Sequence, residues 1–304
     1  MYNAGMKKLI IRTLTLLTVF DFAKSKYVIF RYKIFQKKWK YQRKILGIKQ
    51  IIFHRTLLNS WEYTSRADLQ KLLELFKVYD TNHELIRLGS SGDGGYLIPN
   101  DLIGIVANIC LGVASDSNFE SDLSGLNIKS IMADGSILSP AIDNVDFEFY
   151  PVFIGPKIST NYMALEDFIS EKSPTDGDLM LSMDIEGDEN FVIIETTRKT
   201  LSRFRIITIE FHNLDLLCFK YYYKQFYAVI RKILDDFEMV HIHPNTYGPT
   251  INYMKIDIPP VLEITFLRKD RITFKNAIKS LPHKLDEKNA AWMPEINLMK
   301  EWYL

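Results

Sequence analysis

The chain has 304 residues, of which 47% are hydrophobic, 25% charged and 13% aromatic, a composition that can bury a sizeable core and excludes a disordered chain. The formal net charge of +1 excludes a uniformly basic or acidic protein. The two cysteines, Cys110 and Cys218, are too few for a disulfide framework and form no CxxC metal motif, so we expect a reducing compartment.

Residues 1–55 form a basic block with 14 Lys and Arg and one acid, Asp21, which leaves 24 basic and 36 acidic residues in the rest of the chain. Apolar residues recur there with the spacing of one helix face, and a lysine stripe runs beside them. The apolar positions are Tyr27, Phe30, Ile34, Tyr41, Ile45, Ile48 and Ile52, and the lysines are Lys33, Lys37, Lys40 and Lys44.

This pattern predicts peripheral contact between residues 1–55 and an anionic membrane, with the apolar face entering the interface and the lysines at the headgroups. The alternative is a helix that packs on the chain's own acidic remainder. We expect no nucleic-acid partner, because the aromatic residues lie on the apolar stripe and no nucleic-acid module surrounds it.

The longest early apolar stretch, residues 9–20, is interrupted by Arg12 and is shorter than the ~20 residues that span a bilayer. No small-residue cleavage site follows it, so we expect neither a transmembrane helix nor a signal peptide. The expected location is cytoplasmic, with peripheral attachment to the inner membrane face.

Two regions are predicted: a basic, helical N-terminal extension over residues 1–80 and an α/β domain over residues 81–304. The extension ends in an amphipathic helix that begins after Ser65 and buries Leu69, Leu72, Leu73 and Phe76. The domain opens with a tight turn over residues 92–95.

Seven β-rich runs follow in the domain, at residues 105–111, 129–133, 147–154, 179–185, 205–211, 238–242 and 261–267. Helix-compatible segments at residues 119–126, 164–170, 190–201 and 216–237 separate most of them, which favours parallel strands joined by crossovers. The last two strands have no helix between them and are expected to pair antiparallel. The fold class is therefore a Rossmann-like, mostly parallel sheet of seven strands.

Polar residues follow several of these strands, at the edge where open α/β sheets bind ligands. Gly112 follows the first strand and allows a close backbone approach, and Asp134 follows the second at the distance of a ribose-binding acid. Asp184, Glu186 and His212 follow the fourth and fifth strands, and His241 and His243 share one face of the sixth. These residues could form a proton-transfer site or a metal site of mixed nitrogen and oxygen ligands.

Several motifs over residues 86–268 together resemble the FkbM-like methyltransferase family, which uses S-adenosylmethionine. Four of them are the segments at residues 87–96, 183–189, 209–214 and 241–245. The fifth is the loop at residues 111–113 together with Asp116, Phe119 and Glu120. The resemblance implies a seven-stranded methyltransferase sheet whose last strand is reversed. It also implies O-methylation of a sugar hydroxyl in a cell-surface polysaccharide, glycan or glycolipid precursor.

Under this resemblance, Gly112, Asp116 and Asp134 would bind the cofactor, and His212 would be the general base. Asp184 and Glu186 would bind the acceptor or orient His212. His241, His243 and Asn245 would bind the acceptor. The chain departs from the family pattern at Ala114, where the family loop has glycine, and at residues 244–246, where the family has Gly-Asn-Asn after His-x-His. Ala114 costs about 1 kcal/mol if its φ must be positive.

Two other classes remain open at this point. A metal-dependent hydrolase or transferase could use Asp184, Glu186, His212 and His243 as ligands of a divalent metal. Alternatively, Ala114 and the altered His-x-His segment would suit an inactive binding protein with the methyltransferase fold.

Overall fold

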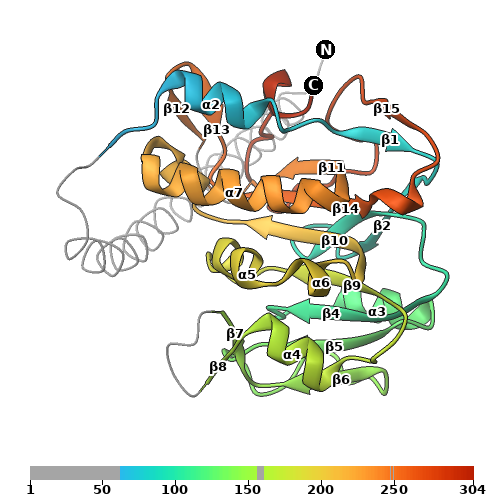
Figure 1. The fold of residues 1–304 in the computed structure, drawn as a ribbon. Coiled ribbons are helices and arrows are strands. Elements are labelled where there is room, and N and C mark those ends of the chain that lie inside the picture. Colours follow the sequence, from blue (N-terminus) through green and yellow to red (C-terminus); the bar gives the residue numbers. More distant parts are fainter. Residues whose placement is uncertain (1–61, 156–160, 247, 249) are drawn as a thin grey trace, which may run out of the picture. The chain divides into compact units, whose positions relative to one another are not determined.

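The computed structural model describes residues 62–155, 161–246, 248 and 250–304 (Figure 1). Residues 62–304 form one compact unit. The predicted membrane-contacting block, residues 1–55, lies outside the described residues. Among those the structure does describe, no helix is both long and apolar enough to cross a membrane.

The core of this unit is a seven-stranded, mostly parallel sheet (Figure 1). Its strand order is β11-β14-β10-β9-β4-β5-β6, and only β14 runs antiparallel, to both β10 and β11. The strands are β4 (Ile105–Leu111), β5 (Lys129–Ala133), β6 (Phe147–Tyr150), β9 (Asp178–Met183), β10 (Phe204–Phe211), β11 (Phe237–Pro244) and β14 (Leu262–Arg268). The predicted sheet of seven strands and the antiparallel last pair are confirmed.

The strands bury both faces because both are covered by other elements. In β9, Leu179, Leu181 and Met183 join the larger core cluster, whereas Met180 between them joins a second cluster. This alternation follows from the two-residue period of a strand. A near-continuous apolar sequence is therefore expected for these central strands.

Helices α4 (Leu165–Lys172), α5 (Glu189–Glu195) and α7 (Lys220–Asp236) lie on one face of the sheet, and α3 (Asn118–Gly125) lies on the other (Figure 1). Helix α2 (Arg66–Leu73) begins after Ser65, as predicted, and the Ser65 side chain caps it by accepting a hydrogen bond from the Asp68 amide. Its leucines belong to the larger core cluster.

Two predicted elements are divided in the structure. The helix expected over residues 190–201 consists of α5 and α6 (Arg198–Leu201), because the Thr197 side chain caps a new helix by accepting from the Thr200 amide. The strand expected over residues 147–154 consists of β6 and β7 (Phe153–Ile154), separated by Pro151, which has no N–H to donate to a ladder. The 3-10 turn η1 (Leu214–Cys218) likewise precedes α7.

The remaining elements are short. Strands β2 (Leu85–Gly89) and β3 (Gly95–Pro99) form a hairpin whose loop reaches the functional edge described below. The other strands are β1 (Tyr79–Thr81) with β15 (Lys275–Ala277), β8 (Tyr162–Met163) with β7, and β12 (Ile251–Tyr253) with β13 (Ile256–Ile258). Two further 3-10 turns are η2 (Lys269–Arg271) and η3 (Lys300–Trp302).

Candidate functional site

The predicted site residues follow the carboxyl ends of neighbouring strands. Gly112 follows β4, Asp134 follows β5, Asp184 follows β9, and His212 follows β10. Because β4, β5, β9 and β10 are parallel neighbours in the sheet, these residues share one edge.

Gly112 is required by the packing of two strands. Its φ is +81°, and a Cβ at this position would lie 1.7 Å from the Asp184 carbonyl oxygen. Two residues on, Ala114 has a φ of +47°, a left-handed conformation that disfavours a side chain. The strain predicted for Ala114 is thus present in the structure.

Asp134 holds this glycine loop in place. Its Oδ2 accepts hydrogen bonds from the Val113 amide at 2.9 Å and the Ala114 amide at 2.8 Å, while its Oδ1 accepts from the Ser136 amide and hydroxyl. Burial raises the pKa of Asp134, but these hydrogen bonds outweigh burial, and the net pKa is lowered. The four donors fill the acceptor positions of the carboxylate.

Asp116 connects the loop after β4 to the β2–β3 hairpin. Its Oδ2 accepts from the Ser90 hydroxyl at 2.5 Å, and its Oδ1 accepts from the Asn118 amide at 2.8 Å. The Asn118 side chain in turn donates to the Ser90 hydroxyl oxygen at 2.8 Å. The hairpin loop is therefore fixed against the start of α3.

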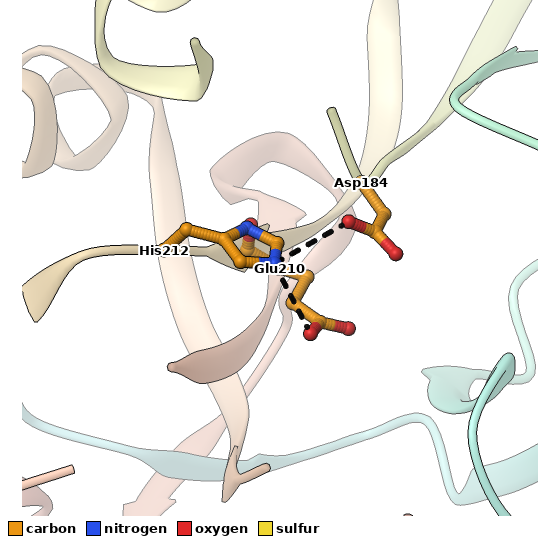
Figure 2. Close-up of side chains that lie close together, drawn as sticks. All are labelled: Asp184, Glu210 and His212. Atoms are coloured by element: carbon orange, nitrogen blue, oxygen red, sulfur yellow. Dashed lines mark hydrogen bonds and ion pairs between the residues drawn. The ribbon is translucent and has the colours of Figure 1, made fainter. Parts of the chain in front are cut away.

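Asp184, Glu210 and His212 converge at the ends of β9 and β10 (Figure 2). His212 Nε2 lies 3.6 Å from Asp184 Oδ1 and 3.6 Å from Glu210 Oε1. Glu186 Oε2 is 3.8 Å from the same nitrogen, although its side chain is 87% exposed. The sequence-based grouping of Asp184, Glu186 and His212 therefore describes side chains that lie close together.

The loop after β9 and the His212 ring are both held by Glu189. Glu189 Oε1 accepts from the Gly187 amide at 2.9 Å and lies 3.0 Å from His212 Nδ1. The loop needs this support because Glu186 and Gly187 have φ values of +58° and +120°. Glu189 is buried and fixes the orientation of the imidazole.

The charges of this cluster perturb one another. Burial raises the pKa of Asp184 to about 7, against the lowering effect of His212. Burial and the nearby Asp184 raise the pKa of Glu210 well above its ordinary value. Burial lowers the pKa of His212, but Glu189, Asp184 and Glu210 outweigh it, so the net pKa is well above 6.5.

A second buried row crosses β10, β14 and β11. Glu210 is the register partner of Glu263, which is also the register partner of His243. His243 Nδ1 lies 3.4 Å from Glu263 Oε2. Asn245 donates to Glu210 Oε1 at 2.8 Å, so this predicted acceptor-binding residue lies beside the Asp184–His212 cluster.

His241 is not part of the Asp184–His212 cluster. Its Nε2 lies 2.9 Å from Asp286 Oδ1, and both side chains are buried.

Among the described residues, two groups could hold a metal. One is Asp184 with Glu210 and His212, and the other is Asp93 with Glu210 and Glu263. Neither group contains Glu186 or His243, two of the predicted metal candidates.

Sequence reasoning missed Glu210, Glu189 and Glu263 as members of this site. Glu210 and His212 are two residues apart, which is the spacing of one strand face, so the signal for Glu210 was present. Glu263 is a charged residue within an apolar strand, a rare placement that indicates a specific partner. The role of Glu189 depends on the left-handed loop, which the sequence does not specify.

No protein-family model matches the sequence, and no curated protein matches it significantly. The functional argument therefore depends on the geometry of this sheet edge and on the sequence motifs that form it.

Proposed function

We propose that the chain is an S-adenosylmethionine-dependent methyltransferase that O-methylates a sugar hydroxyl of a glycan or glycolipid precursor. One observation carries the proposal: the sheet has seven strands with β14 reversed, and a glycine loop adjoins an acid–histidine cluster at its carboxyl edge. The resemblance of residues 86–268 to FkbM-like enzymes implies that combination of fold, cofactor and acceptor class.

In this proposal the cofactor binds along the loop after β4. Gly112 and Ala114 present backbone to it, Asp116 is near its amino-acid end, and Asp134 shapes the loop. A ribose hydroxyl would have to displace the Ser136 hydroxyl from Asp134, because that carboxylate already accepts four hydrogen bonds.

The acceptor hydroxyl would be placed at the cluster of Asp184, Glu210 and His212. Its oxygen forms a bond to the sulfonium methyl carbon, the carbon–sulfur bond breaks, and S-adenosylhomocysteine leaves with the electron pair. The hydroxyl proton must pass to a group at this edge. When no cation is bound, the raised pKa of His212 favours its protonated form at neutral pH, so Asp184, with a pKa of about 7, is then a better proton acceptor than His212, the predicted general base.

Transfer of a labelled methyl group tests the proposal. The full chain is incubated with methyl-labelled S-adenosylmethionine and a membrane fraction rich in lipid-linked glycans. We expect label in the glycan, and a loss of about 10²-fold or more in Asp184→Asn. Asp143→Asn, which removes one exposed carboxylate elsewhere, should leave the rate unchanged. Equal rates in the wild type and Asp184→Asn would exclude this site as the reaction centre.

A further inference from the structure

We propose that Asp184, Glu210 and His212 bind one divalent cation. Binding itself does not depend on methyl transfer. The inference deepens the proposed function, and rests on it, only where it assigns the cation a role toward the acceptor hydroxyl.

The distances within the cluster suit a shared cation. His212 Nε2 lies 3.6 Å from Asp184 Oδ1 and 3.6 Å from Glu210 Oε1, and the three ligand atoms all lie within 4.8 Å of one another (Figure 2). Two ligands about 2.1 Å from one ion are about 3.0 Å apart at right angles and about 4.2 Å apart in line. Small side-chain adjustments would therefore bring all three atoms to one ion.

The His212 ring is oriented as metal-binding histidines usually are. Its Nδ1 lies 3.0 Å from the Glu189 carboxylate and 3.1 Å from the Glu210 carbonyl oxygen. Because Nδ1 is held by these acceptors, a cation would replace the proton on Nε2, the atom that faces Asp184 and Glu210. Glu189 thus acts as a positioning residue for a nitrogen ligand.

Each of the two carboxylate ligands has one oxygen without a hydrogen-bond partner, whereas Glu210 Oε1 accepts from the Asn245 amide at 2.8 Å. Glu210 is 4% exposed, and its Oε2 is buried without a hydrogen bond. Asp184 Oδ1, the atom nearest His212, is also buried without a hydrogen bond. Buried carboxylate oxygens are costly unless they are hydrogen-bonded, paired or bound to a metal. A cation would give both carboxylates, Asp184 and Glu210, the partner that these oxygens lack.

The neighbouring candidate group, Asp93 with Glu210 and Glu263, is less suitable. Asp93 is exposed, and the amides of Asn245 and Asn289 donate to its Oδ1 at 3.4 and 3.3 Å. Asn289 also donates to Glu263 Oε1. Asn245 also donates to Glu210, which both groups share, so the choice depends on the other members. Asp93 and Glu263 each accept from an amide, whereas Asp184 Oδ1 has no hydrogen bond and His212 offers a nitrogen ligand, so we place the cation at His212.

The ligand set indicates which cation. Carboxylates suit both Mg²⁺ and Mn²⁺, whereas an imidazole nitrogen binds transition-metal ions better than it binds Mg²⁺. Two carboxylates and one imidazole therefore favour Mn²⁺ over Mg²⁺. A bound cation would take the acceptor hydroxyl as a further ligand and lower its pKa, which makes the oxygen a better nucleophile.

Binding of Mn²⁺ to the chelator-treated full chain tests the inference, with the loss of the free-ion electron paramagnetic resonance signal as the readout. We expect one Mn²⁺ per chain. Asp184→Asn and Glu210→Gln should each weaken binding by about tenfold or more. Both substitutions neutralise a carboxyl whose charged form burial disfavours, so both variants should fold, which circular dichroism checks.

Asp93→Asn is the matched control, because Asp93 belongs only to the rejected group. It should leave Mn²⁺ affinity unchanged. A wild-type chain that binds no Mn²⁺, or a loss of binding in Asp93→Asn with none in Asp184→Asn, would overturn the inference. S-adenosylhomocysteine binding is measured on the same samples. A chain that binds Mn²⁺ but not S-adenosylhomocysteine retains the cation site and contradicts the proposed function.

Discussion

Glu210 on β10 and Glu263 on β14 are direct register partners, and both side chains are buried. Like charges opposite each other destabilise a sheet, so this pair needs compensation. Asn245 donates to Glu210, and Asn289 donates to Glu263. Burial also raises the pKa of Glu210 well above its ordinary value, which favours the protonated form when no cation is bound. The buried Glu210–Glu263 pair thus lowers the stability of the sheet at the edge where we place the proposed methyl transfer.

Glu210→Gln should stabilise the metal-free protein more at pH 8 than at pH 5. The stability contributed by a carboxyl with a raised folded-state pKa is present below its unfolded value and is lost as the pH rises through the folded value. Glutamine has no such loss and keeps an oxygen for Asn245. Thermal unfolding at both pH values measures the difference. Glu148→Gln, a half-exposed acid on β6, is the control, and an equal effect of Glu210→Gln at both pH values would contradict the account.

The stability contributed by Asp101 should have the opposite pH dependence to that of Glu210. Burial raises its pKa, but hydrogen bonds from Arg271 and the charge of Arg205 outweigh burial and lower it. Its stability contribution is therefore present above the unfolded pKa, near 3.8, and is lost as the pH falls through the lower folded value. Asp101→Asn should cost about 1.5–3 kcal/mol at pH 7 by urea unfolding, because Arg271 loses its charged acceptor, whereas Arg205 keeps the Asp178 carboxylate. A cost as small as that of the exposed control Asp143→Asn would refute this assignment.

Ala114→Gly should stabilise the chain by up to about 1 kcal/mol. Ala114 has a positive φ, and glycine adopts that conformation without strain. The exposed Ala141 has no positive φ, so Ala141→Gly should be neutral or slightly destabilising. Urea unfolding of both variants measures the contrast. Destabilisation by Ala114→Gly as large as that by Ala141→Gly would show that the loop stores no strain.

Charge reversal in the basic block tests the predicted membrane contact. Changing Lys33, Lys37, Lys40 and Lys44 to Glu should abolish cosedimentation of the full chain with anionic liposomes, because each lysine near such a surface contributes about 1 kcal/mol. The matched control reverses four exposed lysines of the described domain, Lys77, Lys129, Lys199 and Lys279. Equal liposome binding by the two variants would remove this idea.

The sheet was largely predictable because its strands are short apolar runs with polar or turn-forming ends. No helix was predicted between β11 and β14, which indicated that these two strands pair antiparallel, and the structure confirms this pairing. The break at Pro151 was readable from proline chemistry but was not predicted. The site was predictable where residues follow a strand directly, as with Asp184 and His212. Glu263 joins it only through the β10–β14 register, which no local pattern specifies.

Calorimetric titration of the full chain with S-adenosylhomocysteine tests the central claim most directly, because the proposed reaction requires that cofactor. The account predicts micromolar binding that weakens in Asp134→Asn, where the loop loses a charged acceptor, and that stays unchanged in Asp143→Asn. Absence of binding to the folded wild-type chain, both with Mn²⁺ and after chelation, would contradict the methyltransferase proposal.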